Sequence, residues 1–311
     1  MAFGAGIGDR TPCALLCRST NRGDGNGTGR SWYCACIGLM VELSSLDDPR
    51  IAAYRFLPER TGRLSPGDRT IVESELVVRR LLRHPWSADV VESALIEHAA
   101  AERLEPLLRA RGVPPDRIFV APKALLEQVV GYNLHHGVFV CMRVPAMASL
   151  SVLPLPAVML VGVSSATNVG AIARSAAAFG FGSLLCDRQS ASPWLRRCLR
   201  VSMGAMFELA LYHATEPTDQ LLEQLRSRGA RLIGAEVDAP HVYAAFEWSR
   251  CDVLVFGSEG SGLDPALLAQ LDAAVRIPMQ PAVESLNVAA AAAILLAEHA
   301  KVCGSIPPST S

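Results

Sequence analysis

The sequence lacks an apolar run of the length that a membrane-spanning helix needs. Such a helix takes about 20 consecutive apolar residues, and the longest candidates, PAVMLVGV and NVAAAAAILLA, are much shorter. Charged residues are also scarce, at 19% of the chain, whereas 50% of the residues are hydrophobic. This balance excludes global disorder, because the chain has enough apolar surface to build a core. We therefore expect no membrane span, and one large domain or two of ordinary size in 311 residues.

The sequence also lacks an even, regular cysteine framework of the kind found in small secreted domains. Four cysteines lie in or beside apolar segments and are expected to be reduced core thiols: Cys141, Cys186, Cys198 and Cys251. Four others match no common zinc-finger spacing and have no histidine nearby: Cys13, Cys17, Cys34 and Cys36. We therefore predict a cytoplasmic protein with no metal site, although zinc at the second group stays conceivable.

Residues 1–39 differ in composition from everything that follows. Their stretch NRGDGNGTGRS is glycine-rich and polar, so it cannot build a core. We expect a disordered extension here. Two alternatives stay open: an organellar presequence, since the segment has arginines and few acids, and a gene start placed too early, since Met40 opens a stretch typical of a true start.

After Met40, alternating strand and helix patterns predict the α/β class. In residues 40–145, KALLEQVVGY predicts a helix and DRIFVAP a strand; the spacing in TIVESELVVRRLL predicts a helix, and ADVVESALI is expected to begin as a strand. This part is therefore predicted to be a smaller N-terminal α/β domain. Prolines and small residues predict a linker at 146–156. From 157 to 303 the alternation is cleaner and predicts a mostly parallel sheet, with 304–311 as a tail.

The first segment with chemical potential is GVSSATNVGAIARSAAAFGF. A predicted strand ends at Val163 and a helix begins near Asn168, which can cap it, while Gly170 permits close backbone approach. Arg174 lies about 200° round the helix from Ile172, which we expect to pack on the sheet. An arginine near a helix start opposes the helix dipole, so contact with an anion such as a phosphate would explain it. A solvated arginine on an exposed face is the alternative.

The second segment is FGSEGSGLDPALL, directly after the apolar stretch CDVLVF. Gly257, Gly260 and Gly262 give the spacing G-x-x-G-x-G, which is neither the dinucleotide fingerprint nor a Walker loop. A ligand is nevertheless expected at the carboxyl end of a strand in an open parallel sheet. Glu259 is placed to hold a polar group of that ligand or to fix a neighbouring loop. A simple glycine-rich turn is the alternative.

The third segment is VRIPMQPAVESLNVAAAAAILL. Ile277 lies at the end of a predicted strand, and Pro281 keeps the following loop out of a helix. Ser285 and Asn287 stand at the beginning of a strongly apolar helix. Both can cap that helix, and both can also bind a substrate hydroxyl.

Together and in this order, the three segments resemble the motifs of the SpoU/TrmH family of RNA ribose 2′-O-methyltransferases, in the SPOUT superfamily. The stretch RVSMGAMFELAL also resembles the family's linking segment. MVELSSLDDPRIAAYR resembles the start of members with an extra N-terminal domain, similar to a ribosomal-protein RNA-binding fold. The resemblance covers residues 40 to about 300, with no gap at the motif positions.

The resemblance implies that residues 157–303 form a deep trefoil knot and that S-adenosylmethionine is the cofactor. Backbone contacts to it are implied at matching positions: Gly257, Ile277 and Leu286. Arg174 matches the arginine that the family places at the attacked ribose. Other catalytic motif positions are matched by Glu259, Ser285 and Asn287, with structural support from Asn168 and Gly170. A homodimer, with its site completed across the interface, and an RNA substrate are also implied.

Clustered arginines in both predicted domains make contact with RNA phosphates plausible. They are Arg55, Arg60, Arg63, Arg69, Arg79, Arg80 and Arg83, and then Arg188, Arg196, Arg197 and Arg200. Aromatics are only 6% of the chain, so base stacking is not indicated. The extra N-terminal domain favours ribosomal over transfer RNA, and the target nucleotide is not indicated. Two alternatives remain: an RNA-binding protein of the same fold without turnover, and a small-molecule enzyme on an ordinary nucleotide-binding sheet.

Overall fold

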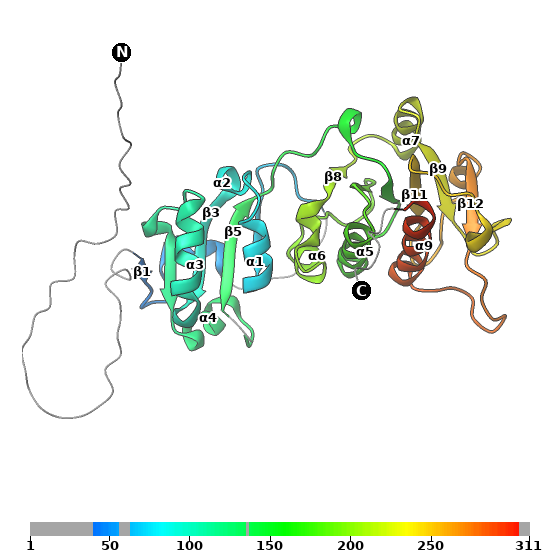
Figure 1. Ribbon diagram of the computed structural model, residues 1–311. Helices are drawn as coiled ribbons and strands as arrows, with labels where there is room; N and C mark the ends of the chain where they lie inside the picture. Colours follow the sequence, from blue (N-terminus) through cyan, green and yellow to red (C-terminus); the bar gives the residue numbers. More distant parts are fainter. Residues whose placement is uncertain (1–39, 56–62, 135–136, 305–311) are drawn as a thin grey trace, which may run out of the picture.

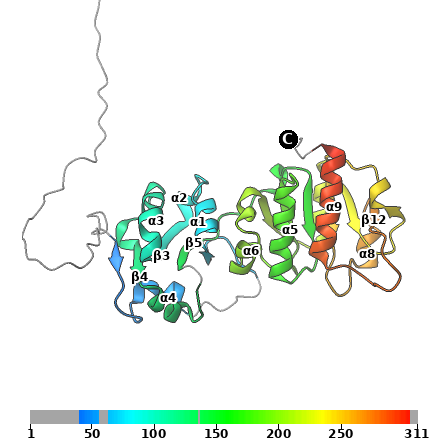
Figure 2. The same cartoon turned by 60° about the horizontal axis from the view of Figure 1, so that its bottom comes forward.

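The computed structural model describes residues 40–55, 63–134 and 137–304 (Figure 1). Within these ranges the chain builds a five-stranded sheet from residues 41–143 and a seven-stranded sheet from residues 157–276. Helices α1 and α6 lie between the two sheets (Figure 1, Figure 2). None of the helices in the described ranges has the length and apolar character needed to cross a membrane. The four cysteines considered as zinc ligands lie outside these ranges.

The first sheet is mixed, with the strand order β1-β4-β3-β5-β2. Strand β4 pairs in parallel with β1 and β3, whereas β5 pairs antiparallel with β3 and β2. The strands are β1 (Val41–Glu42), β2 (Arg69–Glu73), β3 (Val91–Glu97), β4 (Ile118–Ala121) and β5 (Val138–Arg143). The helices are α1 (Glu75–Leu81), α2 (Ser87–Val90), α3 (His98–Ala110) and α4 (Lys123–Val130). The predicted α/β character of this part is confirmed.

Two local predictions in this part are wrong. The stretch TIVESELVVRRLL is not one helix, because its first half pairs with β5 as strand β2. Ser74 breaks the pattern: its φ of 78° turns the chain, and its Oγ accepts a hydrogen bond from Val77 N at 3.4 Å, which caps α1. ADVVESALI does not begin as a strand either, since α2 precedes β3, which starts at Val91.

The second sheet has the order β10-β12-β9-β11-β6-β7-β8, and every pairing of these strands is parallel. The strands are β6 (Ala157–Leu160), β7 (Ser183–Cys186), β8 (Ala210–His213), β9 (Arg231–Ala235), β10 (His241–Val242), β11 (Asp252–Phe256) and β12 (Ala273–Arg276). The helices are α5 (Ala166–Ala178), α6 (Arg196–Val201), α7 (Thr218–Ser227), α8 (Pro265–Leu268) and α9 (Val288–Cys303). The predicted parallel sheet is confirmed.

The two faces of the second sheet are both covered by helices. Along β6, Val158 and Leu160 pack in the core with α5 and α9, whereas Ala157 and Met159 pack in the core with α7 and α8. This alternation follows from the period of two in a strand. Because both faces are buried, all residues of β6, β7 and β11 are buried, which is why these strands read as continuous apolar runs. Because β6, β7 and β11 run in parallel, their carboxyl ends share one edge of the sheet.

A cluster around Glu73 joins the two sheets. Glu73 is 7% exposed and accepts hydrogen bonds from Arg196 Nη1 at 3.0 Å and from Arg200 Nη1 at 2.8 Å. Tyr132 donates its hydroxyl to the same carboxylate at 2.9 Å, and burial raises the pKa of this tyrosine to about 12. Both arginines belong to the group that the sequence suggested for RNA phosphates. The structure gives them another partner, because Glu73 at the end of β2 faces α6.

Candidate functional site

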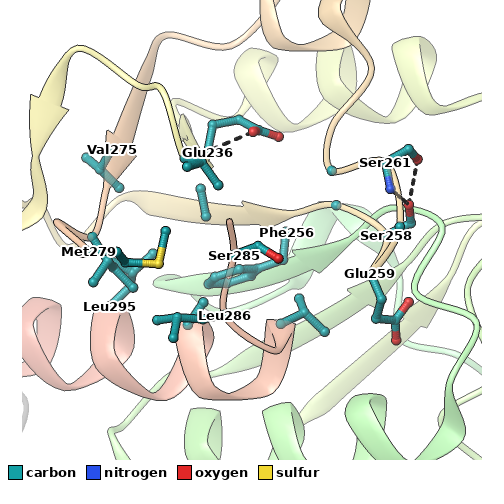
Figure 3. Close-up of a pocket in the computed structure, with 18 residues that line it drawn as sticks. Glu236, Phe256, Ser258, Glu259, Ser261, Val275, Met279, Ser285, Leu286 and Leu295 are labelled. Carbon is teal, nitrogen blue, oxygen red and sulfur yellow. Dashed lines mark hydrogen bonds between the residues drawn. The ribbon is translucent and has the colours of Figure 1, made fainter. Parts of the chain in front are cut away.

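A cavity of about 290 Å³ opens where β9, β11 and β12 end. Its walls come from residues 235–237, 256–262, 275–279 and 285–295 (Figure 3). The cavity lies at the carboxyl edge of the parallel sheet, the place where open α/β sheets bind ligands. Its volume is close to the lower limit of typical small-molecule sites, about 300 Å³.

The three residues predicted to contact a cofactor all line this cavity. Gly257 follows β11, Ile277 follows β12, and Leu286 precedes α9, with 37% of its surface exposed. Glu259 and Ser285 line it as well. The remainder of the wall includes the apolar side chains Phe256, Val275, Met279, Val288 and Leu295 (Figure 3). Loops that are distant in the sequence therefore converge on one space.

The glycine loop folds back on itself directly after β11. Ser258 N donates to Gly262 O at 3.2 Å, and Gly262 N donates to Ser258 O at 3.1 Å. A Cβ atom on Gly257 would lie 2.2 Å from Gly262 C and 2.5 Å from Leu263 N. The absence of a side chain at Gly257 is therefore required by the loop's own packing. A Cβ atom on Gly260 would meet no heavy atom within 4 Å.

Asn168 connects the three motifs. Its Nδ2 donates to Glu259 Oε1 at 2.5 Å, and its Oδ1 accepts a hydrogen bond from Asn287 Nδ2 at 3.2 Å. The prediction that Asn168 caps α5 is wrong, because the helix begins at Ala166 and Ser165 is its N-cap. Ser165 Oγ accepts the backbone N–H of Asn168 at 3.4 Å. The Asn168 amide is thereby left to bridge the second and third motifs.

The arginine of the first motif lies on the exposed face of α5. Ile172 is fully buried and Arg174 is exposed, as their angular offset predicted. Within the described ranges Arg174 forms no hydrogen bond or ion pair, and it does not line the cavity. Gly170 lies against α6, where an added Cβ would be 2.8 Å from Cys198 O. The close backbone approach predicted at Gly170 is therefore confirmed, and Arg174 is available to a partner or ligand.

Of the two predicted capping residues before α9, Asn287 caps the helix. Its Oδ1 accepts hydrogen bonds from Ala289 N at 2.9 Å and from Ala290 N at 3.4 Å. Ser285 is exposed on the cavity wall and has no hydrogen-bond partner in the described part of the chain. Asn287 therefore uses its oxygen for the helix and its nitrogen for Asn168.

Two substitutions of Asn287 separate these roles. Asn287→Ala removes the cap and the donor to Asn168, so we expect a loss of about 2 kcal/mol in the free energy of unfolding. Asn287→Ser retains an N-cap oxygen and loses only the donor, so about 1 kcal/mol is expected. Urea unfolding measures both, and hydrogen exchange in the first turn of α9 should rise for alanine alone. Equal exchange in the two variants would show that the cap contributes nothing.

Glu236 is a cavity residue that sequence reasoning missed. It follows β9, lines the cavity, and accepts a hydrogen bond from Leu263 N on Oε1 at 2.7 Å. The stretch ARLIGAEV predicts a strand, but this prediction assigns no function to Glu236 near its end. A usable signal was present, since Glu236 directly follows β9, whereas Glu259 stands three residues past the end of β11. Open α/β sheets bind their ligands at this edge.

The sequence model of the SpoU rRNA Methylase family matches residues 156–297. This range contains every residue that lines the cavity, together with Asn168 and Arg174. A protein of Mycobacterium tuberculosis (strain ATCC 25618 / H37Rv), named as an uncharacterized tRNA/rRNA methyltransferase, is 33% identical over 276 residues. The match covers 85% of this chain and 93% of that protein.

Two solved structures share the fold. The AdoMet-bound rRNA methyltransferase from Sinorhizobium meliloti has a TM-score of 0.71 at 20% identity, covering 85% of this chain and 98% of that one. A structure described as an RNA 2′-O ribose methyltransferase has a TM-score of 0.65 at 24% identity, covering 84% and 99%. At these identities the likeness supports the arrangement of both sheets and carries no statement about chemistry.

Proposed function

Because this chain belongs to the SpoU rRNA Methylase family, we propose that it methylates a ribose 2′-hydroxyl in RNA with S-adenosylmethionine as the methyl donor. The observation that carries this proposal is the convergence of the second and third motif loops on one cavity, with the first motif hydrogen-bonded to both. Glu259 and Asn287 from two of the loops meet through Asn168 from the third. The mycobacterial relative named as a tRNA/rRNA methyltransferase supports RNA as the substrate.

The lining of the cavity suits the proposed methyl donor in polarity and in charge. Phe256, Val275 and Leu295 offer an apolar wall for a purine ring, and backbone groups at Gly257, Ile277 and Leu286 can meet its polar edge. The charged side chains among the described lining residues are both carboxylates, Glu236 and Glu259, and no basic side chain accompanies them. This set suits a cationic ligand. When bound, S-adenosylmethionine supplies a methyl group attached to a positively charged sulfur, and this sulfur becomes a neutral thioether when the methyl group is transferred.

Arg174 is proposed to act on the RNA. A guanidinium stays protonated at neutral pH, so it is a poor base. It instead holds a phosphate next to the attacked ribose and polarises the 2′-hydroxyl, which aligns the oxygen for in-line attack. Alignment of reacting groups can contribute up to about 7–11 kcal/mol. A nearby group or a water molecule takes the proton.

The remaining motif residues position the nucleotide and the loops. Ser285, exposed and without a partner among the described residues, offers a hydroxyl to the substrate at the cavity wall. Glu259 and Asn287 keep the second and third loops in register through Asn168. Gly170 lets α5 lie close to α6, and this contact fixes the helix one turn before Arg174.

We further propose the trefoil knot in residues 157–303 and a homodimer that completes the site. Arg174 does not line the cavity of its own chain, which suits a site that a second subunit completes. Residues 40–145 form the proposed RNA-binding domain, and on that ground ribosomal RNA is favoured over transfer RNA. The other predicted boundaries, at 1–39, 146–156 and 304–311, and the cytoplasmic location stay predictions.

Mapping of 2′-O-methyl groups tests the proposal. RNA from cells with and without this gene is compared, and we expect a single methylated nucleotide, in ribosomal RNA, to disappear with the gene. In parallel, purified protein is titrated with S-adenosylmethionine. Saturable binding without any change in the map would leave another RNA or another atom as the target. Absence of saturable binding would instead support the alternative, a protein of this fold that binds RNA without turnover.

A further inference from the structure

Glu236 stands on the cavity wall at the end of β9 (Arg231–Ala235). Figure 3 shows its carboxylate on a different wall from Glu259. Glu259 is engaged by Asn168 at 2.5 Å. Glu236 belongs to none of the motifs that carry the family resemblance, so its presence at the cavity calls for a role of its own.

The two oxygens of Glu236 are engaged very differently. Oε1 accepts a short hydrogen bond from Leu263 N, at 2.7 Å, which ties the glycine loop to the end of β9. Oε2 accepts only a 3.3 Å bond from the adjacent Val237 N. An ionised carboxylate has about four lone-pair sites, and no cation in the described ranges forms an ion pair with Glu236. Acceptor capacity is therefore left over on this carboxylate, which belongs to a residue of the cavity wall.

On the basis of the proposed function, we propose that Glu236 Oε2 accepts hydrogen bonds from the ribose hydroxyls of bound S-adenosylmethionine. The bond from Leu263 N holds the side chain in one orientation, so little freedom is lost when the ligand binds. A carboxylate at the end of a parallel strand that binds a ribose hydroxyl is the solution of dinucleotide-binding sheets. Here the same chemistry arises beside a G-x-x-G-x-G loop that lacks their fingerprint.

A carboxylate in this place has a competing explanation, attraction to the positive sulfonium. The two explanations differ for S-adenosylhomocysteine, which has the same ribose and a neutral sulfur. Loss of a contact to the ribose hydroxyls weakens the binding of both ligands by the same factor. Loss of a charge contact weakens S-adenosylmethionine alone.

The test is isothermal titration of the full chain with both ligands. Glu236→Gln keeps a carbonyl oxygen for Leu263 N, and we expect it to weaken both ligands equally, by about ten- to hundredfold. The 2′-deoxy form of S-adenosylhomocysteine should bind the wild-type protein more weakly than the parent, and the variant should no longer distinguish the two. Asp238→Asn is the matched control, because Asp238 is an exposed carboxylate outside this cavity.

Three results would overturn the inference. Unchanged affinities of Glu236→Gln for both ligands would show that Glu236 does not contact the ligand. Weakening of S-adenosylmethionine alone would assign Glu236 to the sulfonium. If Glu236→Gln weakened S-adenosylhomocysteine and its 2′-deoxy form by the same factor, Glu236 would only support the glycine loop and would not contact the ribose. Failure of the wild-type protein to bind either ligand is a different outcome, since it would contradict the proposed function on which the inference rests.

Discussion

Arg174→Ala is expected to abolish measurable methyl transfer, a loss of at least about a hundred- to thousandfold. The affinity for S-adenosylmethionine should stay within about tenfold, or ~1.4 kcal/mol. The reason is geometric: Arg174 is exposed on α5 and does not line the cavity, so its removal leaves the cofactor wall intact. Single-turnover methylation of total RNA and a cofactor titration measure the two quantities separately.

A matched control for this experiment is Arg226→Ala. Arg226 lies on α7, which covers the other face of the sheet, and pairs with Asp272 at 3.7 Å between partly exposed side chains. A surface pair of this kind contributes about 0–1 kcal/mol to stability, so turnover should be unchanged. Arg174→Lys adds a further test, because lysine keeps the charge and loses the planar fork. If Arg174→Ala methylates RNA at the wild-type rate, the assignment of Arg174 is wrong.

Gly257→Ala is expected to lower the affinity for S-adenosylmethionine by at least about a hundredfold. The new Cβ would lie 2.2 Å from Gly262 C and 2.3 Å from Gly262 O. Both are backbone atoms, so the loop must open to make room, at a cost of about 1–3 kcal/mol. An opened loop displaces the backbone groups that are proposed to meet the cofactor. Cofactor titration measures the affinity, and circular dichroism checks that the sheet persists.

Gly260→Ala provides the control within the same loop. Its added Cβ would have no heavy atom within 4 Å, and Gly260 is not among the glycines with a positive φ. Affinity and turnover should therefore match the wild type. If Gly257→Ala binds normally, the loop is softer than its contacts indicate; if Gly260→Ala loses binding, the exposed tip of the loop contacts a ligand directly.

Much of the second sheet was predictable because its strands are buried on both faces. AVMLVGV and CDVLVF are continuous apolar runs, and such runs are typical of parallel strands between helices. Asp264 followed by Pro265 is also typical of a helix start, and Asp264 does cap α8, since its Oδ1 accepts a hydrogen bond from Ala266 N at 2.7 Å. Local prediction failed around Ser74, where one residue with a positive φ separates β2 from α1. Hydrophobic periodicity is read over a window of many residues, so it cannot detect a break between two elements that is a single residue long.

The sequence by itself determined the class of the fold, the succession of elements from residue 157 onward, and the motif positions that resemble a family. Tertiary structure alone decided which of those positions touch. Asn168 meets Glu259 across 91 residues and Asn287 across 119, because β11 pairs with β6 and β9 in a sheet order that differs from chain order. Likewise, Glu236 accepts a hydrogen bond from Leu263 N, and Glu73 accepts one from Arg196. Hydrophobic periodicity reports which way a side chain points from its own element, and the pairing of distant strands decides what it meets there.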